Sequence, residues 1–289
     1  MRIRSLAVLF ALVLPVEGQA PKKSAPPKAA PAAQPTLKAI WEPVNFPKDI
    51  DLYDIDCPAP EECWAVGDRS TIIHTTDGGK NWTAQLGGDT GATDPKMEEL
   101  FFLDTKYGWA SRADDKLFQT TDGGASWTEA GRQPLGGRRY NFVSPQTGYA
   151  VHWNEHELLR TDDGGKSWKQ HAECKVSFQQ RGLARETRCS FRDMDFSTPS
   201  NGYVTGLVPD AGGRGIVGTT KDGGATWLFS SPDVLDEVAE KGFFWGANGG
   251  IVGLTNNKNL LTTDGGATWT PIISPVAAWE SVSGSPGGS

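Results

Sequence analysis

The sequence predicts an all-β protein, a β-propeller assembled from four-stranded blades. Three observations predict this fold: a turn motif that occurs five times, the spacing of its copies, and a composition with 35 glycines and 11 tryptophans. Successive motif aspartates lie 45, 41, 59 and 42 residues apart. A period of about 42 residues is that of a propeller blade, in which four strands form one sheet.

The repeated motif reads Thr-x-Asp-Gly-Gly-x-x-Trp. It predicts a tight turn between two strands, because glycine adopts positive φ without steric cost and aspartate accepts N–H bonds from its own turn. The tryptophan then begins the next strand and fills the wedge between blades. We therefore assign these residues to architecture and not to catalysis: Asp77, Trp82, Asp122, Trp127, Asp163, Trp168, Asp222, Trp227, Asp264 and Trp269.

This motif resembles the Asp-box, also called the bacterial neuraminidase repeat. Five copies at blade spacing carry the resemblance, and the first departs from it with Asn81 where serine or threonine is usual. The one long step, of 59 residues, predicts an insertion of about one to two dozen residues between the third and fourth copies.

The blades themselves follow from alternation and turn residues. In the first repeat these predict strands at 52–56, 64–67, 71–75 and 82–86. The innermost strands of the later blades are expected at 100–104, 140–144, 191–196 and 243–247. Half-motifs at 40–44 and 276–282 predict a composite sixth blade, in which the two ends of the chain meet and close the ring.

The N-terminal region is expected to lie outside the propeller. Arg2 and Arg4 precede an apolar run that ends at Val16, so residues 1–20 are expected to be a secretory signal peptide. Residues 21–36, rich in proline, alanine and lysine, are expected to be a linker, and 37–289 the propeller domain. We expect an exported, periplasmic or extracellular protein without a membrane span after signal cleavage.

Four cysteines in an exported chain indicate disulfide bonds. Of the three possible pairings, the local one is favoured: Cys57 with Cys63, and Cys174 with Cys189. The spacing contains no CxxC pair, which argues against a zinc site. The stretch from His152 to Glu157 offers two histidines and two glutamates, but on a hairpin and without an HExxH pattern, so no metal and no cofactor is predicted.

Charge excludes one class of partner and suggests another. The chain has a formal charge of −7, which makes nucleic acid binding improbable. Strand order places the turns before the second and fourth strands on one face, and the remaining loops on the other. Seven of the eleven arginines that follow the signal peptide fall near two adjacent loops of that second face.

Arginine suits bidentate contact with carboxylates or phosphates, so these loops are predicted to bind an anionic partner. The alternative is that the arginines are solvated charges paired with Glu173 and Glu186. Replacing Arg138, Arg139, Arg188 and Arg192 by glutamate is expected to leave stability nearly unchanged. The full set of predicted contact residues is Arg132, Arg138, Arg139, Tyr140, His152, His156, Arg181, Arg185, Arg188 and Arg192.

The repeat region 37–289 resembles the photosystem II stability/assembly factor family. The resemblance rests on strands of the type Cys63-Trp64-Ala65-Val66-Gly67-Asp68 that alternate with the Asp-box turns. It implies an exported, monomeric, non-enzymatic propeller that binds protein, with a membrane-complex subunit of acidic surface as partner. In a photosynthetic source, it implies the thylakoid lumen.

The alternative is a sialidase-like glycoside hydrolase or a glycan-binding propeller. A sialidase mechanism requires a tyrosine–glutamate nucleophile pair and an aspartic acid. The F/Y-R-I-P motif of that family is absent from the sequence, and Tyr149 and Tyr203 occupy the strand position of Trp64 and Trp109, which predicts a place in the core. No catalytic residue is therefore predicted.

Overall fold

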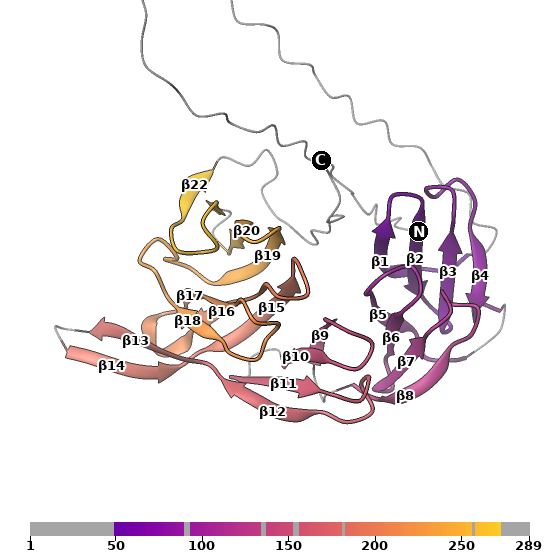
Figure 1. The fold of residues 1–289 in the computed structure, drawn as a ribbon, viewed down its shortest axis with the longest axis horizontal. Coiled ribbons are helices and arrows are strands. Elements are labelled where there is room, and N and C mark those ends of the chain that lie inside the picture. Colours follow the sequence, from indigo (N-terminus) through magenta and orange to yellow (C-terminus); the bar gives the residue numbers. More distant parts are fainter. Residues whose placement is uncertain are drawn as a thin grey trace, which may run out of the picture.

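Five antiparallel four-stranded sheets form an arc of blades in a computed structural model of the chain (Figure 1). The structure describes residues 49–89, 93–133, 137–152, 156–180, 183–255 and 258–272, with side chains for all of these except 137–138, 152, 178–180 and 183–184. The predicted all-β propeller with five Asp-box blades is confirmed. The signal peptide, the linker and both halves of the composite sixth blade lie outside the described residues.

Within each blade the strands follow chain order from the axis of the arc to its outer rim. The first two blades are β1 (Leu52–Ala59), β2 (Glu62–Gly67), β3 (Thr71–Thr75) and β4 (Thr83–Leu86), and β5 (Met97–Phe102), β6 (Gly108–Arg112), β7 (Lys116–Thr120) and β8 (Thr128–Arg132). The third is β9 (Gly137–Phe142), β10 (Gly148–His152), β11 (Glu157–Thr161) and β12 (Lys169–Glu173).

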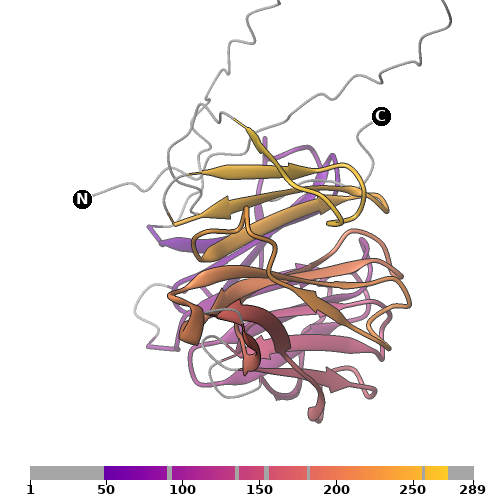
Figure 2. The same cartoon turned by 90° about the vertical axis from the view of Figure 1, so that its left-hand side faces the viewer.

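The fourth blade is β15 (Ser190–Phe196), β16 (Gly202–Val208), β17 (Arg214–Thr220) and β18 (Leu228–Ser230), with the short 3-10 helix η1 (Pro209–Ala211) after β16. The fifth is β19 (Ala239–Trp245), β20 (Gly249–Leu254), β21 (Asn259–Thr262) and β22 (Thr270–Ile272). Seen from its side, the arc shows these twisted sheets stacked one on the next (Figure 2).

The predicted insertion is a β-hairpin and not a loop. Its strands β13 (Lys175–Gln180) and β14 (Leu183–Arg188) pair with each other as a separate two-stranded sheet. Both predicted disulfides are present: Cys57 is bonded to Cys63, and Cys174 is bonded to Cys189 at the base of the hairpin.

Three predicted inner strands were placed too late in the chain, because β5, β9 and β19 end at residues 102, 142 and 245 and not at 104, 144 and 247. Residues 103–104 and 143–144 belong to the turns that follow β5 and β9, where Leu103 and Val143 donate N–H bonds to Tyr107 O and Thr147 O. Asp104 Oδ1 also accepts the N–H of Lys106 and Tyr107. A side chain that accepts bonds from its own turn competes with the strand ladder, which explains the earlier strand end.

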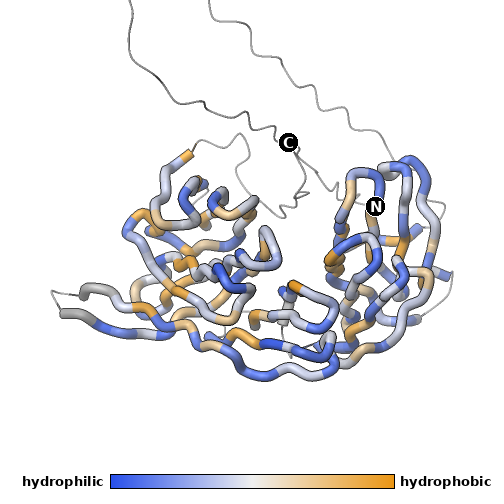
Figure 3. Tube along the Cα trace, viewed as in Figure 1, coloured by the Kyte–Doolittle hydropathy of each residue, from blue (hydrophilic) through white to orange (hydrophobic). Residues whose placement is uncertain are grey.

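Aromatic stacks form the core between blades. In the first four blades, the aromatic residue of the second strand stacks on the inner-strand phenylalanine of the next blade, as Trp109 does on Phe142 with ring centroids 3.6 Å apart. The Asp-box tryptophan of that next blade, Trp168, meets the same phenylalanine edge-on. Tyr149 and Tyr203 are buried, as predicted. Figure 3 shows the hydrophilic residues gathered along the outer rim.

Candidate functional site

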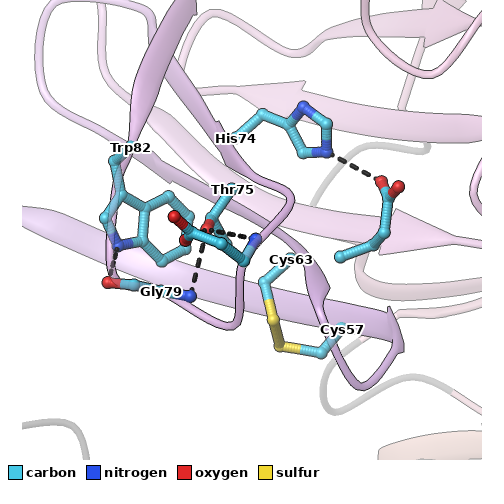
Figure 4. The surroundings of a disulfide bond; sticks show 8 residues. Cys57, Cys63, His74, Thr75, Gly79 and Trp82 are labelled. Atoms are coloured by element: carbon cyan, nitrogen blue, oxygen red, sulfur yellow. Dashed lines mark hydrogen bonds and ion pairs between the residues drawn. A yellow bond between two sulfur atoms is a disulfide. The ribbon is translucent and has the colours of Figure 1, made fainter.

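Each Asp-box turn is held by hydrogen bonds among its own residues, and Figure 4 shows the first of the five. In the first, Thr75 Oγ1 donates to Asp77 Oδ1 and accepts the N–H of Gly79, while Asn81 donates to both oxygens of Asp77. Trp82 Nε1 donates to Gly79 O at 3.0 Å. Asn81 therefore supplies, with its amide, the bond that serine or threonine supplies in the other four copies.

These bonds keep the five aspartates ionised. Backbone and side-chain bonds from Asn81 lower the pKa of Asp77 to about 2, and bonds from the motif serine or threonine do the same for Asp163, Asp222 and Asp264. A carboxylate with these partners is an acceptor and a poor proton donor near neutral pH. The geometry thus supports the architectural assignment.

The buried hydroxyl of the motif is expected to contribute to stability. Thr120 Oγ1 donates to Asp122 Oδ1 and accepts the N–H of Gly124, and Thr120 is 1% exposed. Thr120→Val leaves that N–H without its acceptor, so we expect a loss of about 1–3 kcal/mol in the free energy of unfolding. Urea denaturation measures it.

The neighbouring residue provides the control for this prediction. Thr121 is exposed in the same turn, so Thr121→Val makes the same chemical change where water replaces the lost bond. It is expected to shift stability by under about 0.5 kcal/mol. Equal losses for the two variants would contradict the role given to the Thr120 hydroxyl.

The two faces of the arc are defined by these turns. In all five blades the first glycine of the motif donates its N–H to the turn between the first two strands, as Gly78 does to Glu61 O. We call this the Asp-box face, and the opposite face, with the connections into each new blade, the loop face. Among the predicted contact arginines that the structure describes, Arg132, Arg139 and Arg192 lie near the loop-face ends of strands, and Arg185 and Arg188 lie on the hairpin.

The structure does not bring all predicted contact residues together. Arg132 is exposed at the end of β8, and Arg185 and Arg188 are exposed on the hairpin. Tyr140 is buried on β9, where its hydroxyl donates to Glu99 O at 3.2 Å. Arg181 and the side chains of Arg138 and His152 lie outside the described residues.

Arg139 and Arg192 lie on inner strands and not in loops. Nε of Arg139, in the third blade, is 3.2 Å from Oδ1 of Asp193 in the fourth. Nε of Arg192, in the fourth blade, is 3.7 Å from Oε1 of Glu240 in the fifth. Reversing either charge would place a carboxylate beside another. The expectation that reversal of these two arginines leaves stability unchanged is therefore corrected.

Arg139 belongs to a set of five ionisable residues that we call the axial ring. One residue comes from the inner strand of each blade, and it pairs with the equivalent position of the second strand of the same blade. In all five blades this pair directly follows a register shift between the two strands. The shift is a β-bulge, which re-aims the side chains that follow it. The ring consists of Asp54, Glu99, Arg139, Asp193 and Lys241.

Carboxylates on these inner strands tie adjacent blades together. Asp54 Oδ2 accepts the N–H of Leu100 at 2.9 Å, and Asp56 Oδ2 accepts that of Phe102 at 2.6 Å. Burial raises the pKa of Asp56 and of Asp195 to about 7. Asp56 and Asp195 each lie two residues after a member of the axial ring, on β1 and β15. Neither the axial ring nor the hydrogen bonds that Asp54 and Asp56 accept from the next blade were predicted from the sequence. A comparison of the five inner strands, aligned position by position, carries the signal for both, because each strand has a charged residue at the same place.

A second charged cluster lies at the base of the hairpin. Glu173 accepts Arg188 Nε at 2.6 Å and Lys175 Nζ at 2.8 Å, and His156 Nε2 lies 3.6 Å from it. The hydrogen bond from Lys175 lowers the pKa of Glu173. One of the predicted contact arginines, Arg188, is therefore paired with Glu173, as expected if the arginines are charges paired with nearby acids.

Two shallow cavities lie on the surface of the described residues. One, of about 150 Å³, is lined by Tyr53, Lys96, Glu98, Glu99, Ser111 and Gln133, and the other, of about 280 Å³, by Arg160, Asp162, Lys169, Gln170 and His171. Both are smaller than the usual pocket for a small molecule. Among the described residues, no group of three metal-ligating side chains converges and no helix is long and apolar enough to cross a membrane.

Comparison with known proteins confirms the resemblance noted from the motifs. A family model described as photosynthesis system II assembly factor YCF48 matches residues 33–130, from before the first blade to the middle of β8 in the second. The photosystem II stability/assembly factor HCF136, chloroplastic, of Cyanidioschyzon merolae is 36% identical over 78 residues, 26% of this chain. The match spans 18% of the length of that relative.

Solved structures bear on the fold. A GH74 enzyme of Niastella koreensis aligns with 76% of this chain and 38% of its own, with a TM-score of 0.52 and 18% identity. A structure described as YCF48 bound to D1 peptide aligns with 80% of this chain and 83% of its own, with a TM-score of 0.42 and 19% identity. The first of these likenesses supports the propeller fold alone.

Proposed function

We propose that this chain, which resembles photosystem II assembly factors through its first two blades, is an exported, non-enzymatic propeller that binds protein and assists the assembly of a membrane complex. The match of residues 33–130 to that family carries the proposal. The chloroplastic relative is named a stability and assembly factor of photosystem II. For this chain we propose a subunit of such a complex as partner, bound by a monomer in the periplasm or in the thylakoid lumen.

The contact surface is proposed on the loop face and the hairpin beside it. Arg132, Arg185 and Arg188 are the exposed members of the predicted set, and Arg138 and Arg181 remain in the proposal from the sequence. Guanidinium groups pair with carboxylates in a bidentate manner, so an acidic partner surface fits them. Arg139 and Arg192 contribute indirectly, because they join inner strands of neighbouring blades.

Charge reversal of the exposed arginines tests this surface. In a variant with Arg132, Arg185 and Arg188 replaced by glutamate, we expect capture of a membrane-complex subunit from the protein's own cell envelope to fall at least about tenfold, because close like charges oppose docking. Since Arg188 pairs with Glu173, thermal unfolding verifies that the variant keeps the fold. Capture is measured by cross-linking the purified protein to envelope fractions and quantifying the partner by mass spectrometry.

The Asp-box face offers a matched control. Lys80, Lys166 and Lys221 are exposed in three Asp-box turns, and their replacement by glutamate changes the net charge by the same amount on the opposite face. This control is expected to capture the partner as the wild type does. Equal loss in both variants would assign the effect to net charge and overturn the surface.

A hydrolase function receives no specific support from the geometry. A sialidase-like nucleophile would be a tyrosine paired with a carboxylate, but the hydroxyl of Tyr140, which lies beside Arg139 in the sequence, donates to the backbone carbonyl of Glu99. The likeness to hydrolases is one of fold. If the wild type captures no envelope protein and instead hydrolyses or binds a glycan, the proposed function is wrong.

A further inference from the structure

We propose that the β13–β14 hairpin is a docking edge for an extended acidic segment of a partner protein, which adds as a third strand beside β14. The proposal rests on the protein-binding function proposed above and names the mode of contact and the chemistry of the partner. It assigns a role to an insertion that the other four described blades lack.

In chain order the hairpin follows the outer strand of the third blade and precedes the inner strand of the fourth, and it extends outward from the arc beside β18 (Figure 1). Its ladder has six residue pairs, from Lys175 with Arg188 at the base to Gln180 with Leu183 near the tip. It is therefore long enough to present a strand edge of ordinary length.

The base of the hairpin is fixed to the fourth blade. Cys174, Val176 and Cys189 are buried in one core cluster with residues of the third and fourth blades, and the disulfide joins the two ends of the hairpin. Thr187 Oγ1 donates to Asp210 Oδ2 at 2.6 Å. A strand edge held in this way is ordered before a partner arrives, which reduces the entropy lost on binding.

The edge of β14 is open to pairing. Among the strands that the structure describes, β13 and β14 have no hydrogen-bonded neighbour except each other. β13 faces the fourth blade, where it contacts β18, so β14 is the outer strand. Edge strands present alternate N–H and C=O groups that pair with an added strand.

The charge of the hairpin selects an acidic occupant. Its sequence from 175 to 188 contains Lys175, Arg181, Arg185 and Arg188 against the single acid Glu186, a net charge of +3 in a chain of −7. Arg185 and Arg188 are exposed, and Figure 3 shows the described part of β14 as hydrophilic. Lys175 and Arg188 share one carboxylate, that of Glu173, while the carboxylate of Asp210 accepts a hydrogen bond from the hydroxyl of Thr187. The exposed Arg185, further along β14, has no ion pair among those found for the described residues.

Fluorescence anisotropy with synthetic peptides tests the proposal on the full chain after signal removal. The probe is a labelled peptide of about eight alternating glutamate and valine residues, the length of a strand. Its first control is the same peptide with alternate backbone nitrogens methylated, which keeps the charge but removes the N–H donors. Its second control replaces glutamate by lysine.

The matched protein variant replaces residues 177–186 by two glycines, which removes the edge but keeps Cys174 and Cys189. Thermal unfolding and the disulfide content verify its fold. A point variant, Arg185→Glu, keeps the hairpin and reverses one exposed charge.

We expect the acidic peptide to bind the wild type, and both control peptides and both protein variants to reduce affinity at least about tenfold. Equal binding of the methylated peptide would show attraction by charge without strand addition and would overturn the proposal, as would undiminished binding to the shortened chain. If the shortened chain still captures the envelope partner, the hairpin inference fails while the proposed function stands. If the wild type captures no envelope partner yet binds the acidic peptide through the hairpin, the proposed function fails while the hairpin inference stands.

Discussion

Phe142→Ala is expected to lower the free energy of unfolding by about 3–5 kcal/mol, the cost of truncating a fully buried aromatic residue. The Phe142 ring is 1% exposed. It lies parallel to Trp109 of the preceding blade, at 3.6 Å and 3°, and meets Trp168 of its own blade edge-on at 6.0 Å. The substitution therefore removes the centre of a three-ring stack that joins two blades.

Because the same stack recurs between other blades, the loss should reduce cooperativity along the arc as well as stability. Urea denaturation followed by tryptophan fluorescence and by circular dichroism measures both. Leu228→Ala is the control, since Leu228 is 73% exposed and is expected to change stability by under about 0.5 kcal/mol. A loss for Phe142→Ala no larger than for the control would contradict the account of the core.

The wild-type protein is expected to be more stable at pH 5 than at pH 8, by a margin on the order of a few kcal/mol. Burial raises the pKa of Asp56 and Asp195 from 3.8 to about 7 in the folded state. A group whose pKa is raised by folding binds its proton more tightly in the folded state. Its contribution is fully present below the unfolded pKa and is lost as pH rises through about 7.

The surroundings of these two carboxyls explain the direction. Asp54 raises the pKa of Asp56, and Asp193 and Asp56 raise that of Asp195, while N–H groups of Phe102 and Phe244 on the next blades favour the charged forms. Burial raises the pKa of Asp54 and Asp193 in the axial ring, and the positive charges of Arg139 and Lys241 oppose that rise. The aspartates of the Asp-box turns change stability only below about pH 4, because their pKa is lowered.

The double variant Asp56→Asn and Asp195→Asn tests this prediction. Asparagine keeps an oxygen that accepts the N–H bonds but carries no charge. In the double variant, the free energy of unfolding at pH 8 should rise toward its value at pH 5. The difference in stability between pH 5 and pH 8 should therefore be smaller than in the wild type. The measurement is urea unfolding at both values of pH, and a wild type equally stable at both would contradict the prediction.

The repeated features could be predicted because each is encoded within a few consecutive residues. The five Asp-box turns, the blade period and the pairing of Cys57 with Cys63 depend on local sequence. The buried position of Tyr149 and Tyr203 followed from their equivalence to Trp64 and Trp109. Inner-strand ends were less accurate, because Asp104 and its turn compete with the ladder for the same backbone groups.

The candidate site depended on relations between distant segments. Arg139 and Arg192 could be assigned to loops from spacing, but the bulges of β9 and β15 and the carboxylates of neighbouring blades decide where their side chains lie. The axial ring requires the register of all five inner strands. The hairpin was visible in sequence only as a long step between motifs, because its pairing follows from two short segments without a typical turn dipeptide.

Mapping cross-links between this protein and its captured membrane-complex partner by mass spectrometry tests the central claim most directly. We expect cross-linked residues on the loop face and the hairpin, near Arg132, Arg185 and Arg188. We also expect few near Lys80, Lys166 and Lys221 on the Asp-box face, although those lysines are exposed and reactive. Cross-links concentrated on the Asp-box face would contradict the account.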